Sequence, residues 1–451
     1  MSLLDPRTLA LVAVALAIVA VSSWRRRRSL PPGPKGVPIL GNIFDVPKDF
    51  EWLTYDRWSR EYRSDVIYLN LAGTPVLVVN SAEAAHELFE KKSSLYSDSV
   101  GCDWHFVFMG YGDSWRERRR VFHQYFHPNA TIEYRPRTLK VARELLLRLL
   151  DTPDDFMVHL RHMAGSLILG TVYGIDTALH AMAMAGNAGA YLVDTIPMLK
   201  YVPAWFPGAK FKRQAAEWKK ATDAMVERPF KAVMNAMAEG KAVPSIVTSL
   251  LTGEEDRKPP ETVISGVGAA AYTALGTFFL AMLKYPEIQR KAQAEVDRVV
   301  GSDRLPDFSD DLPYVTALVK EVLRWQPVTP LAVPHRLTHD DVYNGHLLPA
   351  GSVVVGNSWA ILHNETVFPE PEEFVPERWI DEYGKLRPEM RDAELAAFGF
   401  GRRICPGRHL ALSSTWIGIA SVLATFDLQK GVDADGNVIE PEVKYTSGLV
   451  S

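Results

Sequence analysis

The chain has 451 residues, 47% of them hydrophobic, so it is long enough to bury a large core. Its net charge of −4 at pH 7 argues against a nucleic-acid-binding protein, and we expect no nucleic-acid partner. Its only two cysteines, Cys102 and Cys405, are too few for a disulfide framework and favour a reducing compartment.

The first 28 residues have the pattern of a membrane anchor. Residues 8–23 are almost all Leu, Ala, Val and Ile, and Trp24 leads into arginines at 25–28. A cleaved signal peptide carries its positive charge before the apolar run, whereas here the charge follows it. The run is short for a full span, but Trp24 and the arginine stems can extend it. We therefore expect one transmembrane helix with the remaining chain in the cytosol. A buried core helix is the alternative, which consecutive arginines disfavour.

Residues 29–42 form a proline-rich connector that cannot be helical. We expect it to act as a stiff hinge between the anchor and a single domain, residues 43–451. Within that domain, residues 66–71 and 75–80 are β-rich runs on either side of a turn, which predicts a hairpin.

Helical spacing and helix-start signals account for most of the middle of the chain. The expected helices cover residues 81–92, 113–127, 137–150, 156–173, 180–199, 210–238, 260–284, 286–300 and 313–325. After Gln326 the composition changes to Pro, Val, Gly and His with short strand-like runs, such as residues 352–356. A last helix is expected over residues 410–425. The predicted fold class is therefore mainly α with a minor β part.

A glycine-rich loop directly before the last helix contains Cys405. The run from Phe398 to Gly407 reads Phe-Gly-Phe-Gly-Arg-Arg-Ile-Cys-Pro-Gly. Such a loop can stabilise a thiolate, because nearby glycines free backbone N–H groups and arginines add positive charge. The alternative is a small buried cysteine, the usual fate of a lone cysteine, but it does not explain the position in this loop.

Three further patterns precede the loop in the chain, and each alone has a simple structural explanation. Trp115 and Arg119 share a helix face, Glu321 and Arg324 are spaced for an ion pair, and residues 376–379 read Pro-Glu-Arg-Trp. Together with the cysteine loop they resemble the cytochrome P-450 family of haem-thiolate proteins. The four patterns match W-x-x-x-R, E-x-x-R, P-E-R-F and F-x-x-G-x-R-x-C-x-G of that family.

The resemblance implies a cytochrome P-450 fold and a haem, iron protoporphyrin IX, with Cys405 as the axial iron ligand and catalytic residue. The residues that it implies for haem binding are Trp115, Arg119, His335, Phe398, Arg403, Cys405 and Gly407. The tryptophan, the histidine and both arginines would hold the haem propionates, and Phe398 would shield the thiolate. A buried ion triad of Glu321, Arg324 and Arg378 would fix the loop beneath the haem.

The proline connector resembles that of microsomal members of the family, and residues 276–282 and 357–362 resemble fungal members of secondary or xenobiotic metabolism. This likeness implies a monooxygenase that inserts one oxygen atom from O2 into an apolar small molecule. It implies electrons from an NADPH-dependent flavoprotein reductase and a single-pass location in the endoplasmic reticulum membrane. Five arginines could form a cationic docking surface for that reductase or simply a solvated face: Arg116, Arg118, Arg120, Arg402 and Arg408.

The chain departs from the family on the other side of the haem. Monooxygenase members carry an acid–alcohol pair, A-G-x-D-T, in the helix that crosses the haem, and this pair delivers protons. Here no acidic residue lies between Glu261 and Glu287. Thr273 is the only candidate for the catalytic alcohol, and an ordinary helix threonine is the reading we favour. About two helical turns are missing by comparison.

Other segments are also short: the stretch between Tyr96 and Trp115, the segment after Ile175 and the C-terminus. Several gaps in one chain favour an imperfect gene model or splice product. Two alternatives to the monooxygenase therefore stay open. The first is an O2-independent haem-thiolate isomerase or dehydratase, and the second is a non-enzymatic or inactive haem-binding product.

Overall fold

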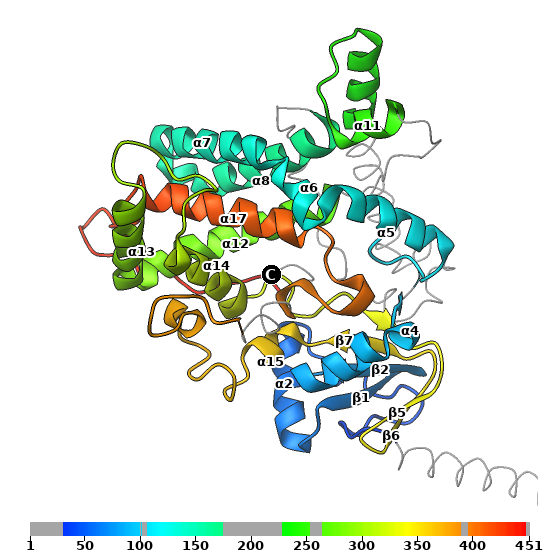
Figure 1. The fold of residues 1–451 in the computed structure, drawn as a ribbon. Coiled ribbons are helices and arrows are strands. Elements are labelled where there is room, and N and C mark those ends of the chain that lie inside the picture. The colour runs from blue at the N-terminus through cyan, green and yellow to red at the C-terminus, as the bar shows by residue number, and fades with distance from the viewer. Residues whose placement is uncertain are drawn as a thin grey trace, which may run out of the picture.

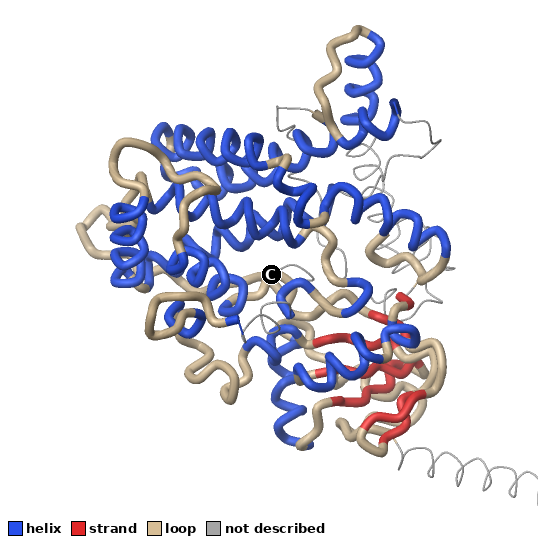
Figure 2. The backbone as a smooth tube through the Cα atoms, in the orientation of Figure 1, coloured by secondary structure: helices blue, strands red, loops and turns tan. Residues whose placement is uncertain are grey.

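Helices dominate the molecule, and the strands gather at one end of it (Figures 1 and 2). The structure is a computed structural model that describes residues 30–99, 101, 106–174, 228–252, 264–388 and 396–447, with only the backbone for 264–270. The prediction of a mainly α chain with a minor β part is confirmed. In the described part of the chain no helix is both long and apolar enough to cross a membrane. The predicted anchor lies outside the described residues.

The long helices begin and end within about two residues of the predicted limits, except that the predicted start of one of them, residues 260–263, lies outside the described residues. They are α5 (Asp113–Phe126), α7 (Arg135–Asp151), α8 (Phe156–Tyr173), α12 (Ile264–Lys284), α13 (Pro286–Val299), α14 (Pro313–Trp325) and α17 (Arg408–Leu423). Helices α7, α13 and α14 carry proline in the first turn, where its missing N–H has no cost. The predicted helix 180–199 lies outside the described residues, and 228–238 is the described part of helix 210–238.

The predicted helix 81–92 is divided, because α3 (Ala82–Ala85) continues into a π-helical turn, His86–Lys91. A separate turn of helix, α4 (Ser93–Tyr96), follows. The remaining helices are α2 (Glu51–Tyr62), α6 (Pro128–Ile132), α11 (Ile246–Thr252) and α15 (Ser358–Leu362), with 3-10 turns at Pro153–Asp155, Pro376–Trp379, Ala396–Phe398 and Gly401–Arg403.

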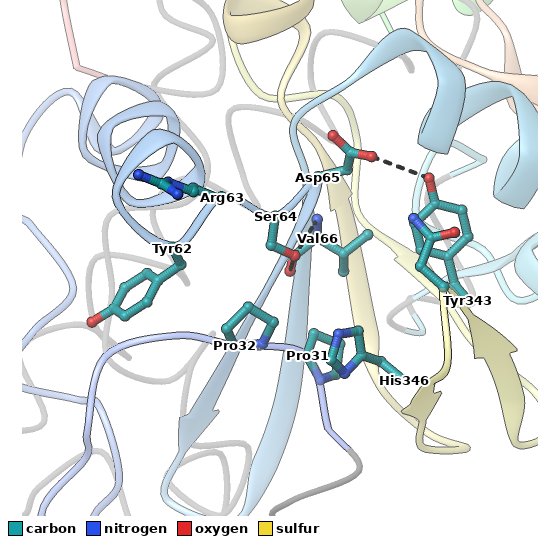
Figure 3. Close-up of a pocket in the computed structure, with 10 residues that line it drawn as sticks. Pro31, Pro32, Tyr62, Arg63, Ser64, Asp65, Val66, Tyr343 and His346 are labelled. Carbon is teal, nitrogen blue, oxygen red and sulfur yellow. Dashed lines mark hydrogen bonds between the residues drawn. The ribbon is translucent and has the colours of Figure 1, made fainter.

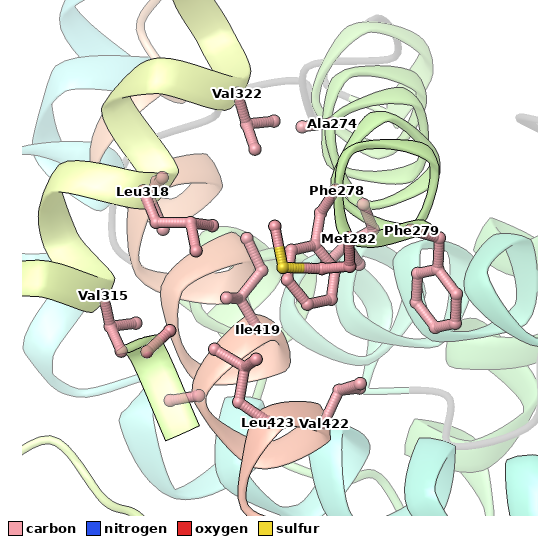
Figure 4. Close-up of a cluster of buried hydrophobic side chains, with 14 of the residues drawn as sticks. Ala274, Phe278, Phe279, Met282, Val315, Leu318, Val322, Ile419, Val422 and Leu423 are labelled. Carbon is pink, nitrogen blue, oxygen red and sulfur yellow. The ribbon is translucent and has the colours of Figure 1, made fainter. Parts of the chain in front are cut away.

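The largest core cluster surrounds α12, which packs against α8, α14 and α17. Phe278 and Met282 of α12 lie against Leu318 of α14 and Ile419 of α17 (Figure 4). All four side chains have no exposed surface, and each contributes about 1.5–3 kcal/mol by leaving water. This packing fixes α14 and α17 relative to each other, and α17 follows the cysteine loop directly.

A small mixed sheet has the strand order β1-β2-β7-β4-β3 and packs in further core clusters. Its strands are β1 (Val66–Leu71), β2 (Thr74–Val79), β3 (Asp98–Ser99), β4 (His335–Arg336) and β7 (Val353–Gly356). Strands β1 and β2 form the predicted hairpin, and β2 pairs with β7 in parallel. A separate hairpin consists of β5 (Asp341–Tyr343) and β6 (His346–Leu348). The register places His335 of β4 between Ser99 and Val354.

The described part of the proline-rich connector, residues 30–42, is docked on the free edge of β1 and is not a free spacer. The amide of Tyr68 donates to the carbonyl of Pro32 at 3.0 Å, and the amide of Asn42 donates to the carbonyl of Asn70 at 2.6 Å. These bonds cover part of an edge strand that would otherwise leave its backbone groups unpaired.

Candidate active site

The cysteine loop lies between the helical part and the sheet, and α17 begins directly after it (Figure 1). The amide of Cys405 donates to the carbonyl of Phe398 at 2.8 Å, which closes the loop. Burial raises the pKa of the Cys405 thiol, whereas the N–H group of Gly407 and the guanidinium groups of Arg119 and Arg408 act to lower it. These groups favour the thiolate form once a metal ion bound to the sulfur offsets the cost of burying its negative charge.

Gly401 allows the loop to pack closely on the π-helical turn. Its φ of +58° is one that residues with a Cβ rarely adopt, and a Cβ there would lie 2.2 Å from the carbonyl oxygen of Phe89. Its amide donates to Glu90 Oε1 at 2.7 Å, and the ring of Phe400 stacks on that of Phe89 at 5.2 Å. The cysteine loop is therefore held by the same segment that leads into α4.

Trp115, Arg119 and Arg403 form a cluster beside Cys405. The guanidinium groups of Arg403 and Arg119 lie 4.9 and 5.9 Å from the Trp115 ring. Burial lowers the pKa of Arg403 to about 10, and burial also lowers the pKa of Arg119. Two guanidinium groups and a thiol thus share a partly buried space, which makes it electropositive.

His335 borders the same space, because the positive charge of Arg403 helps to lower the pKa of its ring. The Nδ1 atom lies 2.6 Å from the carbonyl oxygen of Tyr96, so Nδ1 carries the proton and donates it to that carbonyl. Burial lowers the pKa of His335 to about 4, so the ring is neutral at pH 7. A neutral ring with Nδ1 protonated leaves Nε2 as an acceptor.

Several donors in this cluster have no acceptor among the described residues. No described residue accepts a hydrogen bond from the indole N–H of Trp115 or from the guanidinium of Arg119. Arg403 uses three N–H groups on the carbonyls of Ser97, Val107 and Met109. It has five, so two remain. The cluster can therefore bind a ligand that carries carboxylates.

Glu321, Arg324 and Arg378 meet as an ion triad. Arg324 donates to both carboxylate oxygens of Glu321 at 2.8 and 2.9 Å, and Arg378 donates to one of them at 3.1 Å. The sequence did not reveal a fourth member, Trp379, whose indole N–H donates to Glu321 at 2.8 Å. The triad ties α14 to the segment before the cysteine loop.

Thr273 lies half-buried in α12, and no described contact joins it to the cluster around Cys405. The neighbouring Tyr272 accepts a hydrogen bond from Arg161 of α8 at 3.2 Å. Instead, Thr277 forms a hydroxyl pair with Tyr445 at 3.1 Å, and burial raises the pKa of Tyr445 to about 12. The two residues are 168 positions apart in the sequence, so no local sequence pattern could predict this contact.

A pocket of about 220 Å³ lies elsewhere, where Pro31 and Pro32 of the connector meet Asp65, Tyr343 and His346 (Figure 3). None of the predicted site residues lines it. The predicted site is therefore the cluster around Cys405 and is separate from this pocket.

Comparison with known proteins identifies the family of the chain. The family model "Cytochrome P450" matches residues 31–443. A cytochrome P450 monooxygenase of Postia placenta is 43% identical over 470 residues, which cover 97% of this chain and 90% of the relative. The tryptamine 4-monooxygenase of Psilocybe cyanescens is 39% identical over 479 residues, 97% of this chain and 94% of the relative.

The thiol loop, the buried triad and these matches define an oxidoreductase of the haem-thiolate class. The chain belongs to the cytochrome P450 family, as the resemblance in its sequence predicted. Both alignments exceed the 451 residues of the chain, so each has positions at which the relative has a residue and this chain has none. The alignments thus contain gaps of the kind that the sequence predicts, without locating them.

The residues present fit a haem, which is the cofactor of this family. The thiol of the half-buried Cys405 matches an iron ligand, and the unused donors of Trp115, Arg119 and Arg403 match the two carboxylates that haem carries. His335 fits such a carboxylate only when Nε2 is also protonated.

Proposed function

We propose that the chain is a membrane-anchored haem-thiolate monooxygenase that inserts one oxygen atom from O2 into an apolar small molecule. One observation carries the proposal. The half-buried Cys405 lies beside Arg119. In the same cluster the indole N–H of Trp115 and two N–H groups of Arg403 have no described acceptor. When bound through a thiolate, haem can cleave the O–O bond of dioxygen.

In this proposal the chain's own residues hold and orient the cofactor. Cys405 is the iron ligand, and the N–H group of Gly407 reduces the cost of its negative charge. Trp115, Arg119 and Arg403 donate to the carboxylates of the haem. The triad around Glu321 keeps the segment before the loop in place, and the half-buried ring of Phe398 limits access of water to the thiolate.

We infer that the electron donor is a flavoprotein reductase with an acidic surface. Arg116 and Arg402 approach the ring of Tyr111 at 5.4 and 5.7 Å, so cations of α5 and of the cysteine loop share one face. Arg118 and Arg120 of α5 are exposed as well. Charge attraction between such faces speeds association, and salt screens it.

A location on the endoplasmic reticulum membrane is part of the proposal. The apolar run at residues 8–23 and the arginines at 25–28 support it. Several large apolar side chains of the connector and of the first residues of the domain are exposed to solvent and could rest on the lipid surface, namely Val37, Ile39, Leu40 and Phe44. An apolar substrate dissolved in the membrane would reach the enzyme from this side.

The test is turnover by the full-length protein in lipid nanodiscs with haem, reductase and NADPH. The proposal predicts that NADPH is consumed and that one atom of ¹⁸O2 enters an apolar substrate. It also predicts that salt and the variant Arg120→Glu both slow reduction by the reductase. Turnover of peroxides without NADPH would favour the isomerase class, and haem binding without any turnover would favour an inactive product.

A further inference from the structure

Two successive carbonyl groups at the end of α4 face the haem-binding cluster. The carbonyl oxygen of Tyr96 accepts the Nδ1 proton of His335 at 2.6 Å. The carbonyl oxygen of Ser97 accepts the Nε proton of Arg403 at 2.5 Å. The backbone of this one short segment therefore orients the two residues, from β4 and from the cysteine loop, that we assign to the haem carboxylates.

A charged network outside the cluster holds this segment. The Tyr96 side chain is 1% exposed, and its hydroxyl donates to Asp341 Oδ2 at 2.8 Å. Lys92 Nζ lies 2.9 Å from both oxygens of Asp341 and also donates to the carbonyl of Val342 at 3.0 Å. The tyrosine thus joins Asp341, at its hydroxyl end, to His335, at its backbone end.

The protonation states make this connection a strong one. Burial, reinforced by the bond to Asp341, raises the pKa of Tyr96, so its hydroxyl keeps its proton. Burial alone would raise the pKa of Asp341, but hydrogen bonds from Lys92 and Tyr96 outweigh it and the pKa lies below its ordinary value. The carboxylate is therefore ionised at pH 7, and hydrogen bonds to an ionised acceptor are stronger than neutral ones.

We propose that Asp341, acting through Tyr96, is a positioning residue for the haem carboxylates, a role that rests on the proposed function. Ligand sites need their donors within about 0.5 Å of the productive geometry. Without the hydroxyl anchor, α4 is free to shift its two carbonyls, and His335 and Arg403 shift with them. The haem carboxylates are then held less tightly, although Asp341 never touches them.

The test compares Tyr96→Phe with a matched control, Tyr314→Phe. The hydroxyl of Tyr314 also donates to a carboxylate that is paired with a lysine. It lies 3.0 Å from Oε1 of Glu377, and Nζ of Lys291 lies 2.5 Å from the same oxygen. Both variants lose one hydroxyl bonded to a charged pair, but only Tyr96 touches a residue that we assign to the haem carboxylates.

The readout is the rate at which the full-length ferric protein in nanodiscs loses haem to apomyoglobin. We expect Tyr96→Phe to lose haem at least about fivefold faster than the unaltered protein, the effect of one net hydrogen bond. We expect Tyr314→Phe to stay within about twofold. Resonance Raman bands of the propionates should shift in Tyr96→Phe alone. If Tyr96→Phe folds poorly, Asp341→Asn, which keeps the ring, should give the same result.

Equal rates of haem loss in the two variants, with unchanged propionate bands, would overturn the positioning role while leaving the proposed function intact. Failure of the unaltered protein to bind haem with a thiolate spectrum would instead overturn the proposed function, and the positioning role with it.

Discussion

The carboxylate of Glu321 holds the guanidinium of Arg324 through two hydrogen bonds of 2.8 and 2.9 Å, and neither side chain has any exposed surface. Glu321→Gln keeps the shape but leaves the buried charge of Arg324 and the partly exposed charge of Arg378 without a counter-ion. Breaking such a pair costs about 3–5 kcal/mol. We expect the free energy of unfolding in urea to fall by about that amount, or the variant to fail to fold.

The control is an ion pair on the surface. Lys91 and Glu87 lie 3.0 Å apart with the lysine side chain 60% exposed, so Glu87→Gln should change stability very little. If both glutamine variants unfold at the same urea concentration, the triad does not have the structural role that we assign to it.

Gly401 and Gly399 provide a second comparison, within the cysteine loop itself. Both have positive φ, +58° and +82°, so alanine at either position costs about 1–2 kcal/mol of backbone strain. Only at Gly401 would the new Cβ collide with the carbonyl of Phe89, at 2.2 Å, whereas the space at Gly399 is open. Gly401→Ala should therefore lose more thermal stability and more haem than Gly399→Ala. Equal losses would show that the contact with Phe89 does not hold the loop.

The lowered pKa of His335 leads us to expect that haem binding depends on pH. Burial lowers the pKa of His335 to about 4, and its Nδ1–H group donates a hydrogen bond to the carbonyl of Tyr96. A haem carboxylate at Nε2 would raise the pKa of this imidazole, as an opposite charge does, so binding takes up a proton above about pH 4. The contribution of His335 to haem affinity is therefore fully present below that pH. It is lost as the pH rises through the pKa that His335 has in the haem-bound protein.

The measurement is the haem dissociation constant of the unaltered protein and of His335→Gln between about pH 5 and about pH 8. We expect the advantage of the unaltered protein over the variant to shrink as pH rises. Protonation of Cys405 changes the dissociation constant of both proteins in the same way. Its effect therefore cancels in the ratio of the two constants. A ratio that does not change with pH would contradict a carboxylate contact at His335.

The elements that could be predicted from the sequence have signals within themselves. The limits of α14, Pro313–Trp325, agree with the prediction because a proline marks its start and the apolar spacing continues to its end. The strands β3 and β4 have two residues each, and their pairing joins Ser99 to His335. No local pattern encodes a contact at that separation, so the sheet was only partly predicted.

The same distinction separates the site residues. Cys405, Trp115 and Glu321 lie in patterns with fixed spacing, which made them recognisable. Tyr96 and Asp341 interact across 245 residues of sequence, and neither has a distinctive neighbour. Their connection became visible only when the fold brought β5 beside α4.

The most direct test of haem ligation by Cys405 is the Soret spectrum of the reduced, CO-bound protein, with and without Cys405→Ser. We expect a thiolate-type band in the full-length protein in nanodiscs, because we propose the thiol of Cys405 as the iron ligand. Cys405→Ser should lose this band even if some haem stays bound. A thiolate-type band that survives the substitution, or no haem uptake by the unaltered protein, would contradict the central claim.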